Sequence, residues 1–145
     1  MLFCYAFFRG GYKMEDIFCK IINGDIPSRV IFEDEIVKVI MDVNPRSDGH
    51  SLVIPKKHYQ DLYDIENSVL NHIIEVAKKM CALLTEKLDC DGITLEQNNG
   101  ISQEVKHFHL HIIPKYKEGK IDSKTGEIYN NLINNIDEIY KKIIE

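Results

Sequence analysis

The stretch His107-Phe108-His109-Leu110-His111-Ile112-Ile113-Pro114 decides the fold expected for this chain. Three histidines alternate with apolar residues, and successive side chains of a β-strand point to opposite faces. The pattern predicts a strand with imidazoles on one face and core residues on the other. Half of the six histidines lie here, and an imidazole can attack phosphorus or carry a proton near neutral pH. One face of this strand is therefore expected to carry chemistry.

Two other interpretations of the histidine row are a metal site and simple exposure to solvent. His107 and His111 start roughly 13 Å apart at a rise of about 3.3 Å per residue, whereas Zn–N bonds measure about 2.0–2.1 Å. One ion could therefore take at most two of the three imidazoles. Exposure accounts poorly for three histidines in phase followed by Pro114. The row fits best a set of imidazoles with different roles around a phosphate-bearing substrate.

Composition indicates one soluble globular domain, with 145 residues, 44% of them hydrophobic and 28% charged. The net charge of −5 argues against a nucleic-acid partner, because phosphate backbones require a cationic surface. No apolar run reaches the roughly 20 residues of a membrane span, and the apolar leader Met1–Phe8 lacks the features of a signal peptide. We expect a cytoplasmic protein with a disordered leader over 1–13 and a single domain over 14–145.

Periodic patterns elsewhere in the chain predict an α+β fold. Helices are expected over Asp16–Asn23, Glu66–Leu88 and about Glu127–Ile144, and strands over Val30–Phe32, Ile36–Val43, Ser51–Ile54, Ile93–Gln97 and the histidine stretch. The long middle helix carries an apolar stripe, so it should cover an antiparallel sheet of about five strands, joined by the C-terminal helix. Turn-forming residues over 44–49 place His50 at the entrance of a strand.

These residues resemble the histidine triad (HIT) family, and in particular its Hint-like nucleotide hydrolases. The family motif is His-φ-His-φ-His-φ-φ with φ apolar, and the chain matches it at every position from His107 to Ile113. Blocks over 16–27, 32–35 and 49–58 are also similar to the family, and Asn98-Asn99-Gly100 and Gln103 precede the triad. The resemblance extends over residues 15–116.

The resemblance implies a hydrolase that cleaves the P–N or P–O bond at the α-phosphate of a purine nucleotide, as an adenosine 5′-monophosphoramidase does. His109 would attack phosphorus to give a nucleotidyl-histidine, and water would then release the nucleoside monophosphate. His111 and His50 would stabilise the phosphate oxygens. His107 would help to order the strand and relay protons, and its carbonyl would accept from Nδ1 of His109. Asp42 would accept from the ribose hydroxyls. The other implied binding residues are Phe18, Ile21, Ile40 and Val43 around the base, and Asn98 and Gln103 at the phosphate and leaving group.

Two departures from the family pattern affect these expectations. The loop between Gly100 and Gln103 is two residues shorter than usual, which changes the contacts available to a leaving group. Asp16 stands where some bacterial relatives have the first cysteine of a zinc-binding Cys-x-x-Cys. That leaves an incomplete ligand set of Cys19, His58 and His107. We therefore expect no metal and no cofactor.

Three alternatives remain open at this point. Within the enzyme class, the chain would cleave dinucleoside polyphosphates, as in the Fhit branch of the family. A nucleotide-binding regulatory protein with negligible turnover and a metal-binding module are the two alternatives without catalysis. The resemblance also implies a homodimer with the long helix and the neighbouring sheet edge at its interface. Purine nucleoside monophosphate derivatives are the expected partners, and neither nucleic acid nor membrane is expected.

Overall fold

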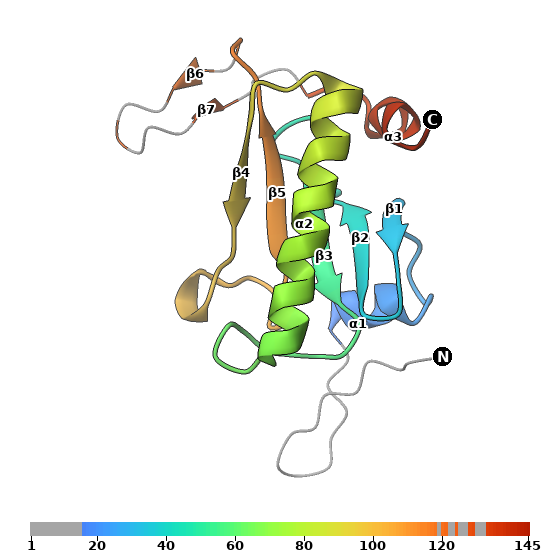
Figure 1. Cartoon of the computed structure of the whole chain (residues 1–145), viewed down its shortest axis with the longest axis vertical. Coiled ribbons are helices and arrows are strands. Elements are labelled where there is room, and N and C mark those ends of the chain that lie inside the picture. Colours follow the sequence, from blue (N-terminus) through green and yellow to red (C-terminus); the bar gives the residue numbers. More distant parts are fainter. Residues whose placement is uncertain (1–15, 119, 122–123, 125–127, 130–132) are drawn as a thin grey trace.

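The computed structural model describes residues 16–118, 120–121, 124, 128–129 and 133–145, and Figure 1 shows their arrangement. The elements in chain order are α1 (Ile17–Ile22), β1 (Val30–Glu33), β2 (Val37–Met41), β3 (Ser51–Pro55), α2 (Asn67–Leu88), β4 (Gly92–Glu96), the 3-10 turn η1 (Gly100–Ser102), β5 (Leu110–Lys115), β6 (Lys120–Ile121), β7 (Ile128–Tyr129) and α3 (Ile136–Ile144). Among these residues, no helix combines the length and apolar character that crossing a membrane requires.

Five strands form one antiparallel sheet in the order β1-β2-β3-β5-β4, which confirms the expected α+β fold. Strand β5 lies between β3 and β4, so its central residues have a neighbour on both sides. His111 of β5 pairs with Leu52 of β3 and with Glu96 of β4. The register thereby places a carboxylate beside the third histidine of the triad.

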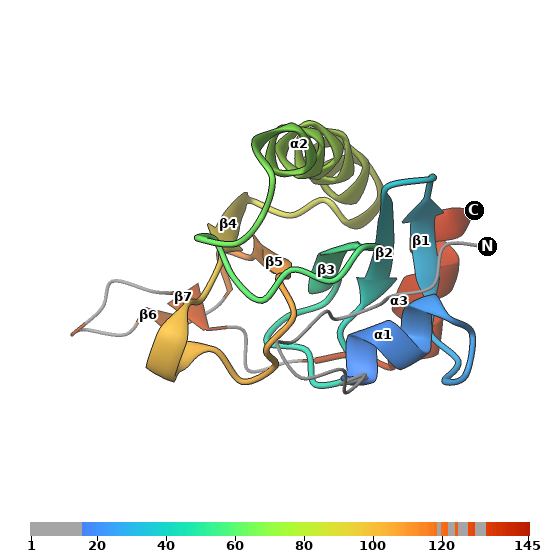
Figure 2. The same cartoon turned by 90° about the horizontal axis from the view of Figure 1, so that it is seen from below.

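Helix α2 covers one face of the sheet, and α1 lies against the other face (Figure 2). Because side chains alternate along a strand, β2 contributes to both sides. Val39 and Met41 belong to the core beneath α2, whereas Ile40 packs with Phe18 and Ile21 of α1. The sheet face on which α1 packs is therefore apolar beneath α1. Polar side chains lie on the rest of that face.

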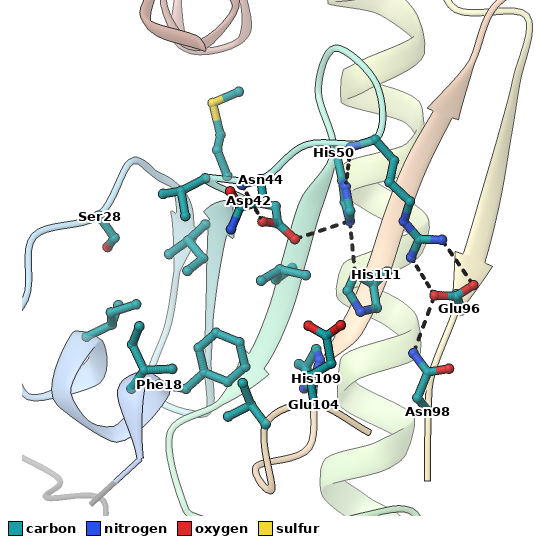
Figure 3. A pocket seen from close by; sticks show the side chains of 18 of the residues that line it. Phe18, Ser28, Asp42, Asn44, His50, Glu96, Asn98, Glu104, His109 and His111 are labelled. Carbon is teal, nitrogen blue, oxygen red and sulfur yellow. Dashed lines mark hydrogen bonds and ion pairs between the residues drawn. The ribbon is translucent and has the colours of Figure 1, made fainter. Parts of the chain in front are cut away.

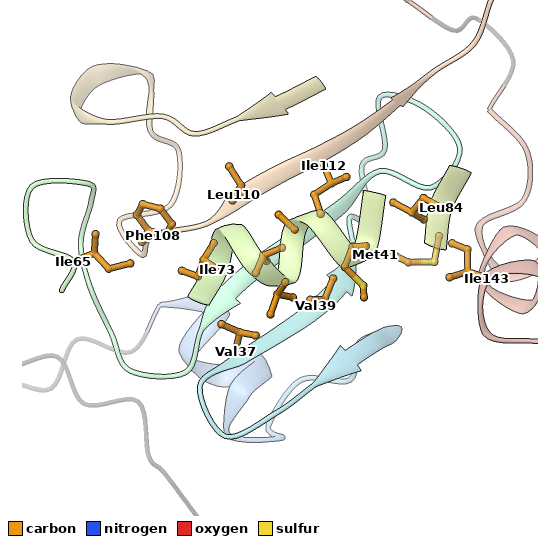
Figure 4. Close-up of a cluster of buried hydrophobic side chains, with 14 of the residues drawn as sticks. Val37, Val39, Met41, Ile65, Ile73, Leu84, Phe108, Leu110, Ile112 and Ile143 are labelled. Carbon is orange, nitrogen blue, oxygen red and sulfur yellow. The ribbon is translucent and has the colours of Figure 1, made fainter. Parts of the chain in front are cut away.

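The apolar positions of the histidine stretch pack into the core beneath α2, as its alternation predicts (Figure 4). Phe108 and Ile112 are almost completely buried, and burial of a side chain of this size stabilises the fold by about 1.5–3 kcal/mol. The residues of α2 that meet them are Ile73, Val76, Ala77, Met80 and Leu84. This packing orients the imidazoles of His109 and His111 away from the core.

The predicted histidine strand is too long by three residues at its N-terminal end. Strand β5 begins at Leu110, so only His111 of the three histidines lies in the sheet. The ladder with β3 stops at the Val53–Leu110 pair, although β3 itself continues to Pro55. Pro55, which the register would place opposite Phe108, has no amide proton to donate, and its carbonyl lies 2.9 Å from Nε2 of His107. Instead the Phe108 amide donates to the Tyr59 carbonyl over 2.7 Å. The segment before β5 is thus held by the loop that follows β3.

The predicted C-terminal helix begins too early. Residues Ile128–Tyr129 form β7 and pair with β6, and α3 starts only at Ile136. Asn135 sets that start, because its side chain accepts from the amides of Asp137 and Glu138 at the helix N-terminus. The leader predicted over 1–13 lies outside the described residues, as does the domain boundary at 14.

Strand β4 is an edge of the five-stranded sheet. Its Leu95 side chain is 47% exposed, and Ile74 of α2 is 49% exposed. Exposed apolar residues on a sheet edge and the helix above it are compatible with the expected homodimer. The dimer stays a prediction for the single chain described.

Candidate active site

A cavity of about 700 Å³ opens on the face of the sheet that carries α1 (Figure 3). Nine of the eleven residues predicted to form the site line it: Phe18, Ile21, Ile40, Asp42, Val43, His50, Asn98, His109 and His111. Apolar side chains fill one half of its wall, and the imidazoles and carboxylates fill the other. A site with one apolar half and one polar half suits a base linked to a phosphate.

His109 is fixed in the tautomer that a nucleophile requires. Its Nδ1 lies 2.7 Å from the carbonyl oxygen of His107, and a carbonyl can only accept, so Nδ1 carries the ring proton. Nε2 is then left with a lone pair. Burial lowers the pKa of His109 despite that hydrogen bond. The predicted hydrogen bond is confirmed, and Nε2 is ready to attack near neutral pH.

His50 and His111 form a second chain of hydrogen bonds whose direction is fixed by the backbone. The Arg46 amide donates to Nδ1 of His50 over 3.0 Å, so the proton of a neutral His50 ring sits on Nε2. That nitrogen lies 2.9 Å from Nδ1 of His111, which must therefore accept. Nε2 of His111 consequently keeps its proton and can donate to a ligand.

Both imidazoles of this chain remain neutral at physiological pH. Burial, followed by the neighbouring His111, lowers the pKa of His50 to about 3. Burial, followed by His109, lowers the pKa of His111 to about 4. His50 uses both ring nitrogens within the protein, and its hydrogen bond orients the ring of His111. The phosphate contact expected of His50 from the sequence stays a prediction.

Asp42 directly follows β2 and lies between the apolar residues and the imidazoles. Its Oδ1 accepts from the Asn44 amide over 2.8 Å, and its Oδ2 lies 3.5 Å from Nε2 of His50. Burial raises the pKa of Asp42 above its usual value. The position suits the predicted contact with sugar hydroxyls.

An ion pair between Arg46 and Glu96 lines the cavity beside His111 and was not predicted. The guanidinium donates to both carboxylate oxygens, with Nη1 at 3.2 Å from Oε1. This hydrogen bond lowers the pKa of Glu96 to about 2, and Asn98 donates to the same carboxylate over 3.3 Å. Only the pairing of β4 with β5 brings Glu96 to this place, so the local sequence pattern carries no signal for it.

Two predicted residues do not line the cavity. Gln103 is buried and donates through Nε2 to the Gln60 carbonyl over 2.5 Å. His107 is fully buried, with Nε2 at 2.9 Å from the Pro55 carbonyl. His107 therefore acts on the cavity through its backbone carbonyl, and the predicted phosphate contact of Gln103 stays a prediction.

The side chain of His107 belongs to a separate cluster centred on the Asp16 carboxylate. Oδ2 of Asp16 lies 3.0 Å from Nδ1 of His58 and 3.2 Å from Nδ1 of His107, and Oδ1 caps α1 by accepting from the Cys19 amide. Burial would raise the pKa of Asp16, but hydrogen bonds from both imidazoles outweigh it and hold the pKa below its usual value. The cluster ties α1 to the segment before β5.

Two groups of side chains have the spacing of metal ligands. Asp16, Cys19, His58 and His107 form one group, and Asp42, His50 and His111 the other. The Cys19 sulfur lies 3.5 Å from Nδ1 of His107 and 3.7 Å from Nδ1 of His58. In the second group, hydrogen bonds engage both ring nitrogens of His50. The expected absence of a metal stays a prediction.

Comparison with known proteins supports the resemblance seen in the motifs. The HIT domain family model matches residues 23–118. An uncharacterized HIT-like protein of Methanocaldococcus jannaschii is 45% identical over 129 residues, 88% of this chain and 97% of its own length. The adenosine 5′-monophosphoramidase of Saccharomyces cerevisiae is 39% identical over 104 residues, 70% of this chain and 63% of its own length.

The fold agrees with solved structures at the same level. A Hit-like protein involved in cell-cycle regulation from Bartonella henselae superposes with a TM-score of 0.77 and 35% identity. The superposition covers 92% of this chain and 96% of that protein. At this identity the likeness extends to sequence as well as fold.

Proposed function

The chain belongs to the HIT family, and from this premise we propose that it is a nucleotide hydrolase that cleaves the P–N bond of purine nucleoside 5′-phosphoramidates. The apolar half of the cavity would hold the base, Asp42 the ribose, and the imidazoles the α-phosphate. The relative from Saccharomyces cerevisiae that carries the name adenosine 5′-monophosphoramidase supports this substrate class.

One observation carries the proposal, namely the opposite tautomers of two neighbouring imidazoles. His109 offers a lone pair at Nε2, because the His107 carbonyl holds its Nδ1 proton. His111 offers a proton at Nε2, because the chain of hydrogen bonds from Arg46 through His50 occupies its Nδ1. Their ring centroids lie 5.0 Å apart. At this separation, the nucleophile can attack the phosphorus of a phosphoryl group while the donor makes a hydrogen bond to one of its oxygens.

The reaction then proceeds in two steps that balance. Nε2 of His109 attacks the α-phosphorus, the P–N bond to the leaving amine breaks, and its electron pair stays on nitrogen, which takes a proton from solvent. Water next attacks the same phosphorus, the P–Nε2 bond breaks, and the electron pair returns to His109 while one proton is released. His111 donates to a phosphoryl oxygen in both steps and stabilises the charge that grows there.

The proposal is tested by incubating the protein with adenosine 5′-phosphoramidate and, separately, with a diadenosine polyphosphate, each with chelator present. We expect AMP release from the phosphoramidate at a higher kcat/KM. Faster cleavage of the dinucleotide would favour a dinucleoside polyphosphate hydrolase. Nucleotide binding without release of AMP from either compound would identify a binding protein and overturn the enzyme proposal.

The pH dependence of kcat/KM gives an independent prediction. His109 must be unprotonated to attack, and its pKa is lowered by burial. An unperturbed imidazole protonates near pH 6.5 as the pH falls. With such an imidazole as nucleophile, kcat/KM would be about tenfold lower at pH 5.5. Because the pKa of His109 is lowered, we expect the acid limb of kcat/KM to have its midpoint below pH 6.5, and kcat/KM to fall less than tenfold between pH 7.5 and pH 5.5. Profiles from pH 4.5 to 8.5, corrected for enzyme-free hydrolysis, measure this, and a midpoint at or above pH 6.5 would contradict it.

A further inference from the structure

Glu104 places a carboxylate in the cavity next to the reacting imidazoles. It follows Gln103 at the end of the shortened loop and is solvent-exposed at the cavity wall. Figure 3 draws Glu104 with His109 and His111 among the side chains that line the cavity. The two steps proposed for the reaction leave Glu104 without a role.

The charge balance of the cavity makes this carboxylate significant. Asp42, Glu96 and Glu104 are the acidic residues of the wall, and Arg46 is its basic residue. Arg46 donates both Nη groups to Glu96, and its charge also opposes the burial that raises the pKa of Asp42. The Glu104 charge reaches Asp42, since after burial it is one cause of the raised pKa of Asp42. With three carboxylates and one guanidinium, the described wall carries a net negative formal charge.

The leaving group on the phosphorus extends toward the Glu104 carboxylate. The base and ribose occupy the half of the cavity formed by Phe18, Ile40 and Asp42, so the remaining substituent on phosphorus must extend toward the open rim. Exposed Ser102 and Glu104 lie on the loop that forms this rim. A positively charged leaving group is attracted to a carboxylate there, and a negatively charged one is repelled.

We propose that Glu104 is a specificity-determining residue that selects cationic amines, and rejects anionic groups, as the leaving group on the phosphorus. The inference rests on the proposed phosphoramidate hydrolysis and names its substrate class more closely. Adenylated amines that carry a second ammonium group, such as diamines or basic amino-acid side chains, are substrates of this chemistry. Anhydrides with sulfate or with further phosphates are disfavoured.

The test uses three adenosine 5′-phosphoramidates with the same P–N bond and a two-carbon tether that ends in an ammonium, a hydroxyl or a sulfonate. For each protein the measured quantity is kcat/KM for the ammonium compound divided by that for the sulfonate. Comparing this ratio between variants cancels the intrinsic reactivity of each compound. Removing one charge about 5 Å from the tether in a partly aqueous site should change the ratio about tenfold.

We expect Glu104→Gln to lower the ratio about tenfold, because the amide keeps the size of the side chain without its charge. Glu104→Asp should keep most of the wild-type ratio. Glu86→Gln, which removes an exposed charge from α2 outside the cavity wall, should leave the ratio unchanged. An unchanged ratio in Glu104→Gln, or an equal fall in Glu86→Gln, would overturn the inference.

Failure of the proposed function gives a different result. The hydroxyl compound carries no tether charge, so its hydrolysis by the wild-type protein tests phosphoramidase activity alone. Without turnover, calorimetric binding of the ammonium and sulfonate compounds to wild type and Glu104→Gln gives the same ratio from dissociation constants. A ratio that does not respond to the Glu104 charge in that measurement also overturns the inference.

Discussion

Replacing His109 by glycine is expected to lower kcat for adenosine 5′-phosphoramidate by about 10³-fold or more, because the covalent route loses its nucleophile. The structure gives this ring a fixed tautomer through the His107 carbonyl, and nearby His111 lacks such a free lone pair. Free imidazole should restore part of the activity of His109→Gly by occupying the vacated space. Initial rates of AMP release with and without added imidazole measure both effects.

A matched control is His72→Ala. His72 is a half-buried histidine of α2 that pairs with Asp34 at 2.6 Å and does not line the cavity. Its removal should leave kcat unchanged within about twofold, since it touches none of the reacting groups. Calorimetric titration with AMP should show that His109→Gly still binds nucleotide. Equal kcat values for wild type and His109→Gly would refute the covalent histidine mechanism.

Replacing Gly49 by alanine is expected to have the largest effect on stability among the described glycines. Gly49 has a φ of +91°, and a Cβ there would lie 2.4 Å from Cδ1 of Leu88 and 3.2 Å from Cγ of Pro114. The positive φ costs about 1–2 kcal/mol for any residue with a side chain, and the overlap adds about 1–3 kcal/mol. We expect a loss of about 2–5 kcal/mol in the free energy of unfolding, measured by urea denaturation.

Gly24→Ala separates the two causes of this loss. Gly24 has a similar φ of +82°, but no atom lies within 4 Å of the position that a Cβ would occupy there. It should therefore lose only the backbone contribution of about 1–2 kcal/mol. Gly49→Ala should also reduce kcat, since the shift of the neighbouring His50 disturbs the hydrogen bond that orients His111. Equal stability of the two variants would show that Leu88 yields at no cost.

Local patterns were enough for most of the framework. Asp16 before Ile17 and Phe18 predicted a capped helix, and the Asp16 side chain does accept from the Cys19 amide. The stripe of α2 and the alternation at Phe108, Leu110 and Ile112 predicted a helix over a sheet. These signals succeed because each depends on residues close in sequence, whose side chains share a face by helix or strand periodicity alone.

The predicted starts of the histidine strand and of the C-terminal helix are wrong, because both depend on contacts with residues outside the local pattern. The histidine stretch alternates perfectly, but the ladder with β3 stops at the Val53–Leu110 pair and that with β4 at the Glu96–His111 pair. The Pro55 carbonyl faces the His107 ring instead of a backbone amide. The apolar spacing after Glu127 is compatible with a helix, but Ile128–Tyr129 pair with β6 and the Asn135 cap delays the helix start to Ile136. Pairing partners are tertiary information, and periodicity cannot supply them.

By itself, the sequence determined the composition of this protein's core, its three imidazoles and the family to which those imidazoles belong. Only the tertiary structure decided what each imidazole does, because protonation at a ring nitrogen depends on the partner that faces it. The His107 carbonyl frees Nε2 of His109, and the Arg46 amide, acting through His50, keeps the proton on Nε2 of His111. Sheet register likewise brought Glu96 beside His111, over a separation in sequence that no local pattern spans.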